Sequence, residues 1–147
     1  MANAVYPIYK TAILAGTTNV SLNINTTTNG PYVSLIDSAA YTYSASHDFY
    51  NDITAGVIGG GTPPVGRIAT PTVGSVAAGV FDGDNVTFTA VTTPTSIEAL
   101  IIYRNNSGAN TSWRLVLFEN SGVTGLPVTP NGGDITVSWN ASGILLI

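Results

Sequence analysis

A proline- and glycine-rich turn runs directly into an alternating strand between residues 125 and 139, and this segment restricts the fold more than any other. Pro127 and Pro130 fix their own φ angles and hold the residues before them in extended geometry. Asn131–Gly133 can adopt the positive φ angles that a sharp reversal needs. Residues 135–139 read Ile-Thr-Val-Ser-Trp, which is the pattern of a strand with one apolar face. The segment therefore predicts a β-domain.

Further strands are predicted at close spacing. Residues 97–103 form a nearly continuous apolar run, typical of a central strand buried on both faces. Residues 113–118 are expected to return as the second strand of a hairpin. The other predicted strands are Val20–Ile24, Tyr32–Ile36, Arg67–Thr72, Val86–Val91 and Ile144–Ile147, with a turn at Asn29–Gly30. Roughly eight short strands predict an all-β fold, a single-domain β-sandwich or barrel.

One or two short helices are expected among these strands. Pro7 and the apolar spacing after it predict a short N-terminal helix or an extended arm within residues 1–16, ended by Gly16. Ser46 is expected to cap a second short helix with Asp48 in its first turn. The apolar side of this helix would carry Phe49, Tyr50 and Ile53.

Composition excludes several classes of protein. The 147 residues include no cysteine, so disulfide scaffolds, thiol catalysis and thiolate metal sites are excluded. The four basic residues are dispersed against eight acidic ones, and binding of nucleic acid is disfavoured because it needs grouped cations. Charged residues make up 8 % of the chain, against about 25 % in ordinary soluble domains. Burial in a larger assembly and a threonine-rich β-protein composition are equally good explanations.

The chain is expected to be soluble and to form one domain. Its longest apolar runs, such as residues 99–103 and 144–147, fall far short of the roughly 20 residues that cross a bilayer. The N-terminal residues lack the basic start and apolar core of a secretory signal. The stretch Gly56–Pro64 predicts a loop rather than a domain linker.

Two motifs with acidic residues suggest a calcium site and an acid–base pair. Asp82-Gly83-Asp84 is similar to the opening of a calcium loop, but the bidentate glutamate is missing, and a hairpin turn is favoured over a cation site. His47 and Asp48 could form an acid–base pair, but sequence neighbours on a helix do not face each other. A helix start is the favoured interpretation of that pair.

Other candidate groups also have structural explanations. Glu98 and Glu119 would need one shared cleft to act as glycosidase carboxylates, and Glu98 is more simply an edge residue or an ion-pair residue with Arg104 or Arg114. Gly59–Gly61 lacks the lysine of a phosphate loop and predicts a flexible loop. Core or interface packing is favoured over sugar binding for the tyrosines, which are Tyr6, Tyr9, Tyr32, Tyr41, Tyr43, Tyr50 and Tyr103. No catalytic, cofactor-binding or metal site is predicted, and no cofactor is expected.

Several segments, in this order, resemble a family of small structural proteins of tailed-bacteriophage virions. The matching segments are Val5–Lys10, Val33–Asp37, Tyr41–Phe49, Gly79–Val91 and Gly125–Trp139. The resemblance spans most of the chain. It departs from the family in a longer Gly56–Pro64 loop and in fewer lysines and glutamates.

The resemblance implies a non-enzymatic protein of the capsid decoration, or cement, type. It implies binding to the major capsid protein, self-association as a dimer or trimer, a location on the capsid surface of the virion, and assembly in the cytoplasm of the host bacterium. Neither a nucleic-acid nor a membrane partner is expected. The alternative is a tail- or fibre-associated component or a receptor- or carbohydrate-binding module, which would use exposed tyrosines and Trp113 as stacking surfaces.

Overall fold

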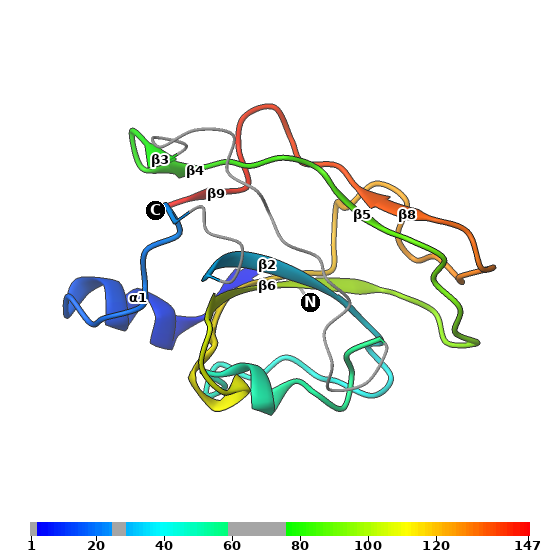
Figure 1. Ribbon diagram of the computed structural model, residues 1–147, viewed down its shortest axis with the longest axis horizontal. Coiled ribbons are helices and arrows are strands. Elements are labelled where there is room, and N and C mark those ends of the chain that lie inside the picture. The colour runs from blue at the N-terminus through cyan, green and yellow to red at the C-terminus, as the bar shows by residue number, and fades with distance from the viewer. Residues whose placement is uncertain (1–2, 25–28, 59–75) are drawn as a thin grey trace.

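The computed structural model describes residues 3–24, 29–58 and 76–147 (Figure 1). The described residues form short strands, one α-helix and two 3₁₀ turns. In chain order the elements are β1 (Ala4–Val5), α1 (Pro7–Leu14), β2 (Asn29–Ile36), η1 (Tyr50–Asp52), β3 (Val76–Ala77), β4 (Val80–Phe81), β5 (Val86–Phe88), β6 (Ala99–Asn106), η2 (Asn110–Ser112), β7 (Arg114–Glu119), β8 (Ile135–Val137) and β9 (Leu145–Leu146). The predicted all-β class with a short helix is confirmed.

A four-stranded antiparallel sheet with the order β1-β7-β6-β2 forms one layer. β6 lies between β2 and β7, with Ile102 opposite Val33 on one side and Ile101 opposite Phe118 on the other. Residues 99–103 are buried throughout, as an unbroken apolar run requires. The prediction of a central strand here, and of a hairpin with residues 113–118, is confirmed.

The remaining strands form a second layer over this sheet. Figure 1 shows β3, β4 and β9 at one end of that layer and the β5–β8 ribbon at the other. The layers share one hydrophobic core, in which Leu100 and Ile102 of β6 belong to the same cluster as Phe81, Phe88 and Val137. The sheets of the described residues stay open, so the two-layer alternative of the prediction describes them and the barrel does not.

The segment before Trp139 folds as its pattern predicts. Val137 is buried while Thr136 is exposed, and the Thr136 hydroxyl lies 2.9 Å from that of Thr87 on β5. In the preceding turn, Gly125 and Gly132 have φ angles of 91° and 89°. The N–H of Gly132 donates to the carbonyl of Val91 at 3.0 Å, so the turn is tied to the chain that follows β5.

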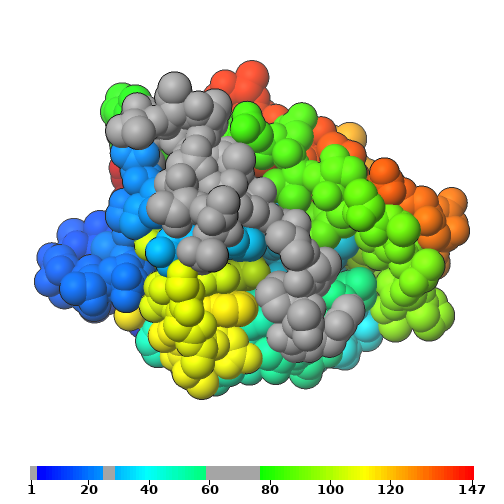
Figure 2. Space-filling model, viewed as in Figure 1, coloured from blue at the N-terminus to red at the C-terminus, as the bar shows by residue number. Residues whose placement is uncertain are grey.

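The predicted N-terminal helix is α1. Pro7 stands in its first turn and Gly16 follows its end with a φ of 63°. Tyr9 and Ala12 face the core, while Leu14 is 88 % exposed. Figure 2 shows the helix projecting from one side of the molecule. Among the described residues no helix has the length and apolar character that crossing a membrane requires.

The strand predicted for Val20–Ile24 is wrong. Side chains take the carbonyls that a neighbouring strand would use: the Tyr9 hydroxyl donates to Val20 at 2.8 Å, and Nε of Arg104 donates to Ser21 at 2.7 Å. The turn predicted at Asn29–Gly30 is also wrong, because both residues belong to β2 and pair with β6. Residue 30 has a φ of 137° and lies against the carbonyl of Ile24, an approach that favours glycine.

The second helix begins later than predicted. Ser46 caps no helix, and the helical turn is η1, beginning at Tyr50. The carboxylate of Asp52 takes the capping role, since its Oδ2 accepts the backbone N–H groups of Asp48 at 3.0 Å and Phe49 at 3.2 Å. The predicted strand Arg67–Thr72 and most of the predicted Gly56–Pro64 loop lie outside the described residues.

Candidate functional site

The His47–Asp48 pair leads to a hydrogen-bonded chain rather than to an acid–base dyad. The Tyr41 hydroxyl lies 3.0 Å from Nδ1 of His47 and 2.9 Å from the hydroxyl of Tyr6. Tyr6 is fully buried, and burial is the main cause that raises the pKa of its phenol, with the hydrogen bond to Tyr41 second. A phenol held neutral in this way is a structural group.

Asp48 has a separate environment. Burial raises the pKa of its carboxyl, the nearby carboxylate of Asp52 raises it further, and the guanidinium of Arg114 lowers it. The Arg114 guanidinium carbon also lies 4.9 Å from the centroid of the Phe49 ring. This arrangement fixes the chain between β2 and η1 against β7. The interpretation of His47 and Asp48 as a capped helix start is wrong, because the helical turn begins only at Tyr50.

The tyrosines lie in the core rather than on a binding surface. Six of the seven are buried: Tyr6, Tyr9, Tyr32, Tyr41, Tyr50 and Tyr103. Trp113 stacks on Tyr103 at a centroid distance of 5.8 Å, and its indole N–H donates to the carbonyl of Gly108 at 2.9 Å. These rings therefore do not form the exposed stacking surface that the sugar-binding alternative assigned to them.

The two glutamates do not share a cleft. Glu98 accepts the backbone N–H of Ser38 at 2.9 Å, and the ion pair expected with Arg104 or Arg114 is not formed. Glu119 stands at the end of β7 and lines a different hollow, which Glu98 does not line. The paired-carboxylate arrangement of a glycosidase is absent from these described residues.

The Asp82-Gly83-Asp84 segment connects β4 to β5. Asp82 accepts the N–H of Gly83 at 2.8 Å, and the carbonyl of Asp84 accepts the indole N–H of Trp139 at 3.0 Å. Within the described ranges no three His, Asp or Glu side chains gather as metal ligands. Gly59–Gly61 lies outside those ranges.

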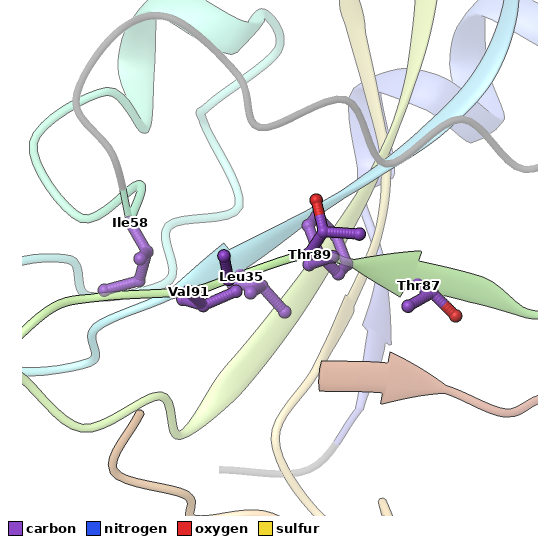
Figure 3. Close-up of a pocket in the computed structure, with 7 residues that line it drawn as sticks. Leu35, Ile58, Thr87, Thr89 and Val91 are labelled. Carbon is purple, nitrogen blue, oxygen red and sulfur yellow. The ribbon is translucent and has the colours of Figure 1, made fainter. Parts of the chain in front are cut away.

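A space of about 340 Å³ lies between the two layers, where Leu35 of β2 faces the chain of β5 and the residues after it. Figure 3 shows Ile58 pointing toward Val91 and Leu35. The described lining residues carry no titratable side chain. Its polar side chains are Thr87 and Thr89, whose hydroxyls alone do not make a reactive site.

An apolar surface is the strongest candidate for a functional site. A groove of about 380 Å³ runs between α1, the segment 20–23 and the chain around β9. The exposed large apolar side chains of the described residues are Leu14 at 88 %, Leu146 at 72 % and Ile147 at 61 % exposure. Ile147 lines the groove, whereas Leu14 and Leu146 only follow the lining residues Ile13 and Leu145 in the chain. We call these three side chains the apolar rim. No charged residue is among the described residues that line the groove.

Sequence reasoning found the strand at 144–147 but not this surface. The strand β9 pairs with β4 on one side and is the edge of its sheet. Leu145 points inward and Leu146 outward, because side chains alternate along a strand. A run of four apolar residues at an edge was the available signal, since alternation must expose one or two of them. A surface of this kind binds other apolar surfaces.

Comparisons with protein-family models, curated proteins and solved structures find no match.

Proposed function

We propose that this chain is a non-enzymatic structural protein of a tailed-bacteriophage virion, which decorates the capsid by binding the major capsid protein. The observation that carries the proposal is the apolar rim beside an uncharged groove. Exposed large apolar side chains near an apolar groove are a common feature of surfaces that bind a partner. The sequence resemblance supplies the identity of the partner.

The composition supports an assembled rather than an isolated protein. Threonine, serine and asparagine replace most charged residues, and these side chains can enter a contact without the large desolvation cost of a lysine or glutamate. The open edges of the short strands also offer backbone groups for pairing.

The proposed mechanism is mechanical. A decoration protein, as a dimer or trimer, would bridge neighbouring capsid subunits through contacts of about 800 Å² per partner. Each contact is modest, but simultaneous contacts multiply in effect because the second is made by a chain already held in place. The shell would then resist the outward pressure of the packaged genome.

The experiment is quantitative mass spectrometry of purified virions combined with localisation of the chain in particle density. We expect hundreds of copies on the outer capsid surface. About a dozen copies or fewer would move the chain to the tail, and the absence of the chain from purified virions would overturn the proposal.

A further inference from the structure

A second hollow, of about 440 Å³, lies at the end of β7 and has a different chemistry from the apolar groove. Its walls include Leu100 of β6, Val137 of β8 and Ile144, which are apolar. Its rim is formed by Asn3, the 121–124 turn and Trp139–Asn140, and Glu119 supplies its one charged side chain among the described lining residues. Mixed walls with few polar groups are typical of binding pockets.

Glu119 is the charged group of this hollow, and its carboxylate lacks a partner. Its side chain is half-buried, and within residues 3–24, 29–58 and 76–147 it forms no hydrogen bond or ion pair. None of the described basic residues pairs with it: Arg104 donates to Ser21, Arg114 lies over Phe49, and Lys10 is exposed on α1. A carboxylate withdrawn from water without compensation is unfavourable, and a cation or a strong donor removes that cost.

Part of the polar rim is hydrogen-bonded within the protein. Oδ1 of Asn3 accepts the N–H groups of Asn120 and Ser121, both at 3.0 Å, and its Nδ2 donates to the carbonyl of Ser121 at 3.0 Å. The Trp139 indole N–H is bound to Asp84. These bonds hold the rim in one arrangement, and the carboxylate of Glu119 is the charged acceptor that a ligand can use.

We propose that this hollow receives the guanidinium of an arginine side chain from a protein partner, with the carboxylate of Glu119 as its counter-ion. A guanidinium matches the two oxygens of a carboxylate with parallel N–H donors and is more weakly hydrated than an ammonium. The apolar walls suit the methylene stem of arginine, and an aromatic side chain such as Trp139 is a favourable neighbour for the cation. The inference deepens the proposed function and rests on it insofar as the arginine belongs to a virion protein.

Proton linkage supports this choice of ligand. Burial raises the pKa of the Glu119 carboxyl above its ordinary range. A bound cation favours the charged carboxylate and so lowers that pKa, which means that binding releases a proton. Binding of a guanidinium should therefore strengthen as the pH rises through the pKa of the free protein, whereas binding of a neutral sugar to the carboxyl should not show that gain.

The test titrates the isolated protein with N-acetyl-arginine amide while the Trp139 indole resonance is followed by NMR, assigned with Trp139→Phe. We expect a saturable shift with a dissociation constant of the order of millimolar, and binding about tenfold weaker for the uncharged citrulline analogue. Glu119→Gln should abolish the saturable shift. Glu98→Gln is the matched control, since Glu98 lies outside the hollow. This variant should keep the saturable shift.

Three results would overturn the proposal: no saturable shift up to about 100 mM probe, equal binding by the Glu119→Gln variant, or saturation by methyl glycosides in place of the arginine probe. The test is independent of the virion experiment. Binding of the probe by a chain that is absent from virions would retain the pocket and remove the proposed function. A chain that is abundant in virions but fails to bind the probe would retain the proposed function and remove the arginine pocket.

Discussion

The hydroxyls of Tyr6 and Tyr41 lie 2.9 Å apart in the core, and this contact joins the residue before α1 to the loop that carries His47. Both rings are buried, so neither hydroxyl can exchange its partner for water. The bond also connects segments 35 residues apart in the chain. It is a polar contact on which the placement of the N-terminal segment depends.

Removal of the Tyr41 hydroxyl should therefore be costly. We expect Tyr41→Phe to lower the free energy of unfolding by about 2 kcal/mol, because it leaves the Tyr6 hydroxyl buried without its partner. The double variant Tyr6→Phe, Tyr41→Phe should lose less than the sum of the two single changes, since no unpaired phenol remains. Urea unfolding measures the free energy of unfolding of the two single variants and of the double variant. Tyr43→Phe is the control, because that half-buried ring packs on Tyr6 without a hydrogen bond from its hydroxyl.

Equal stability of Tyr41→Phe and the Tyr43→Phe control would contradict this account. It would mean that the hydroxyl pair contributes no more than ring packing does.

Gly143 is a turn residue with a positive φ angle and a crowded environment. It has a φ of 100°, and a Cβ built there meets Cγ1 of Val80 on β4. Gly125, with a φ of 91°, has open space at the same position. We expect Gly125→Ala to cost about 1 kcal/mol from backbone strain and Gly143→Ala about 3 kcal/mol from strain and overpacking together. The difference between the two variants in the free energy of unfolding measures the packing of the chain before β9 against β4. Equal costs for the two variants would show that β9 can move aside.

A continuous apolar run predicted its strand correctly, whereas an alternating pattern in a short segment did not. The apolar run at residues 97–103 fits a strand covered on both faces, and the structure places it between β2 and β7. Residues 20–24 have an equally clear alternation but no strand, because the side chains of Tyr9 and Arg104 bind their carbonyls. Those partners come from distant parts of the sequence, and no local pattern contains them.

Among the candidate sites, too, some features could be predicted from the sequence and others could not. The tyrosines were expected in the core, and core packing holds for six of the seven. The hollow beside Glu119 could not be predicted, because it depends on the N-terminal Asn3, the end of β7 and the chain after β8 meeting in space. A lone glutamate at the end of an apolar strand was the available signal, and it says nothing about whether a cation accompanies it.

Glu119 gives a pH-dependent prediction. Burial raises the pKa of its carboxyl in the folded state above the unfolded value of about 4.3. The folded state therefore binds more protons between the two values, and the charged carboxylate destabilises the fold above them. We expect Glu119→Gln to raise the free energy of unfolding by about 1 kcal/mol at pH 7 and to have little effect once the pH falls below the unfolded-state pKa.

Urea unfolding at neutral pH and near pH 4 measures this difference. Glu98→Gln should have the opposite sign at neutral pH, since the carboxylate of Glu98 accepts the Ser38 N–H at 2.9 Å and a neutral amide accepts it less strongly. A destabilising effect of Glu119→Gln at pH 7 would mean that a partner already compensates its charge.

The apolar rim gives the last prediction, which separates folding from assembly. Leu14 and Leu146 are so exposed that their replacement by serine should change the free energy of unfolding by no more than about 0.5 kcal/mol each. If the rim lies in the contact with the capsid, the same double change should reduce the copy number per particle by about tenfold or more, because burial of apolar surface drives most protein–protein association. The control is Thr89→Ala, an exposed position directly after β5. β5 lies at the end of the second layer away from β9 (Figure 1). That variant should keep full occupancy, measured by mass spectrometry of particles assembled with each variant. Full occupancy of the Leu14, Leu146 double variant would mean that another face of the molecule makes the contact.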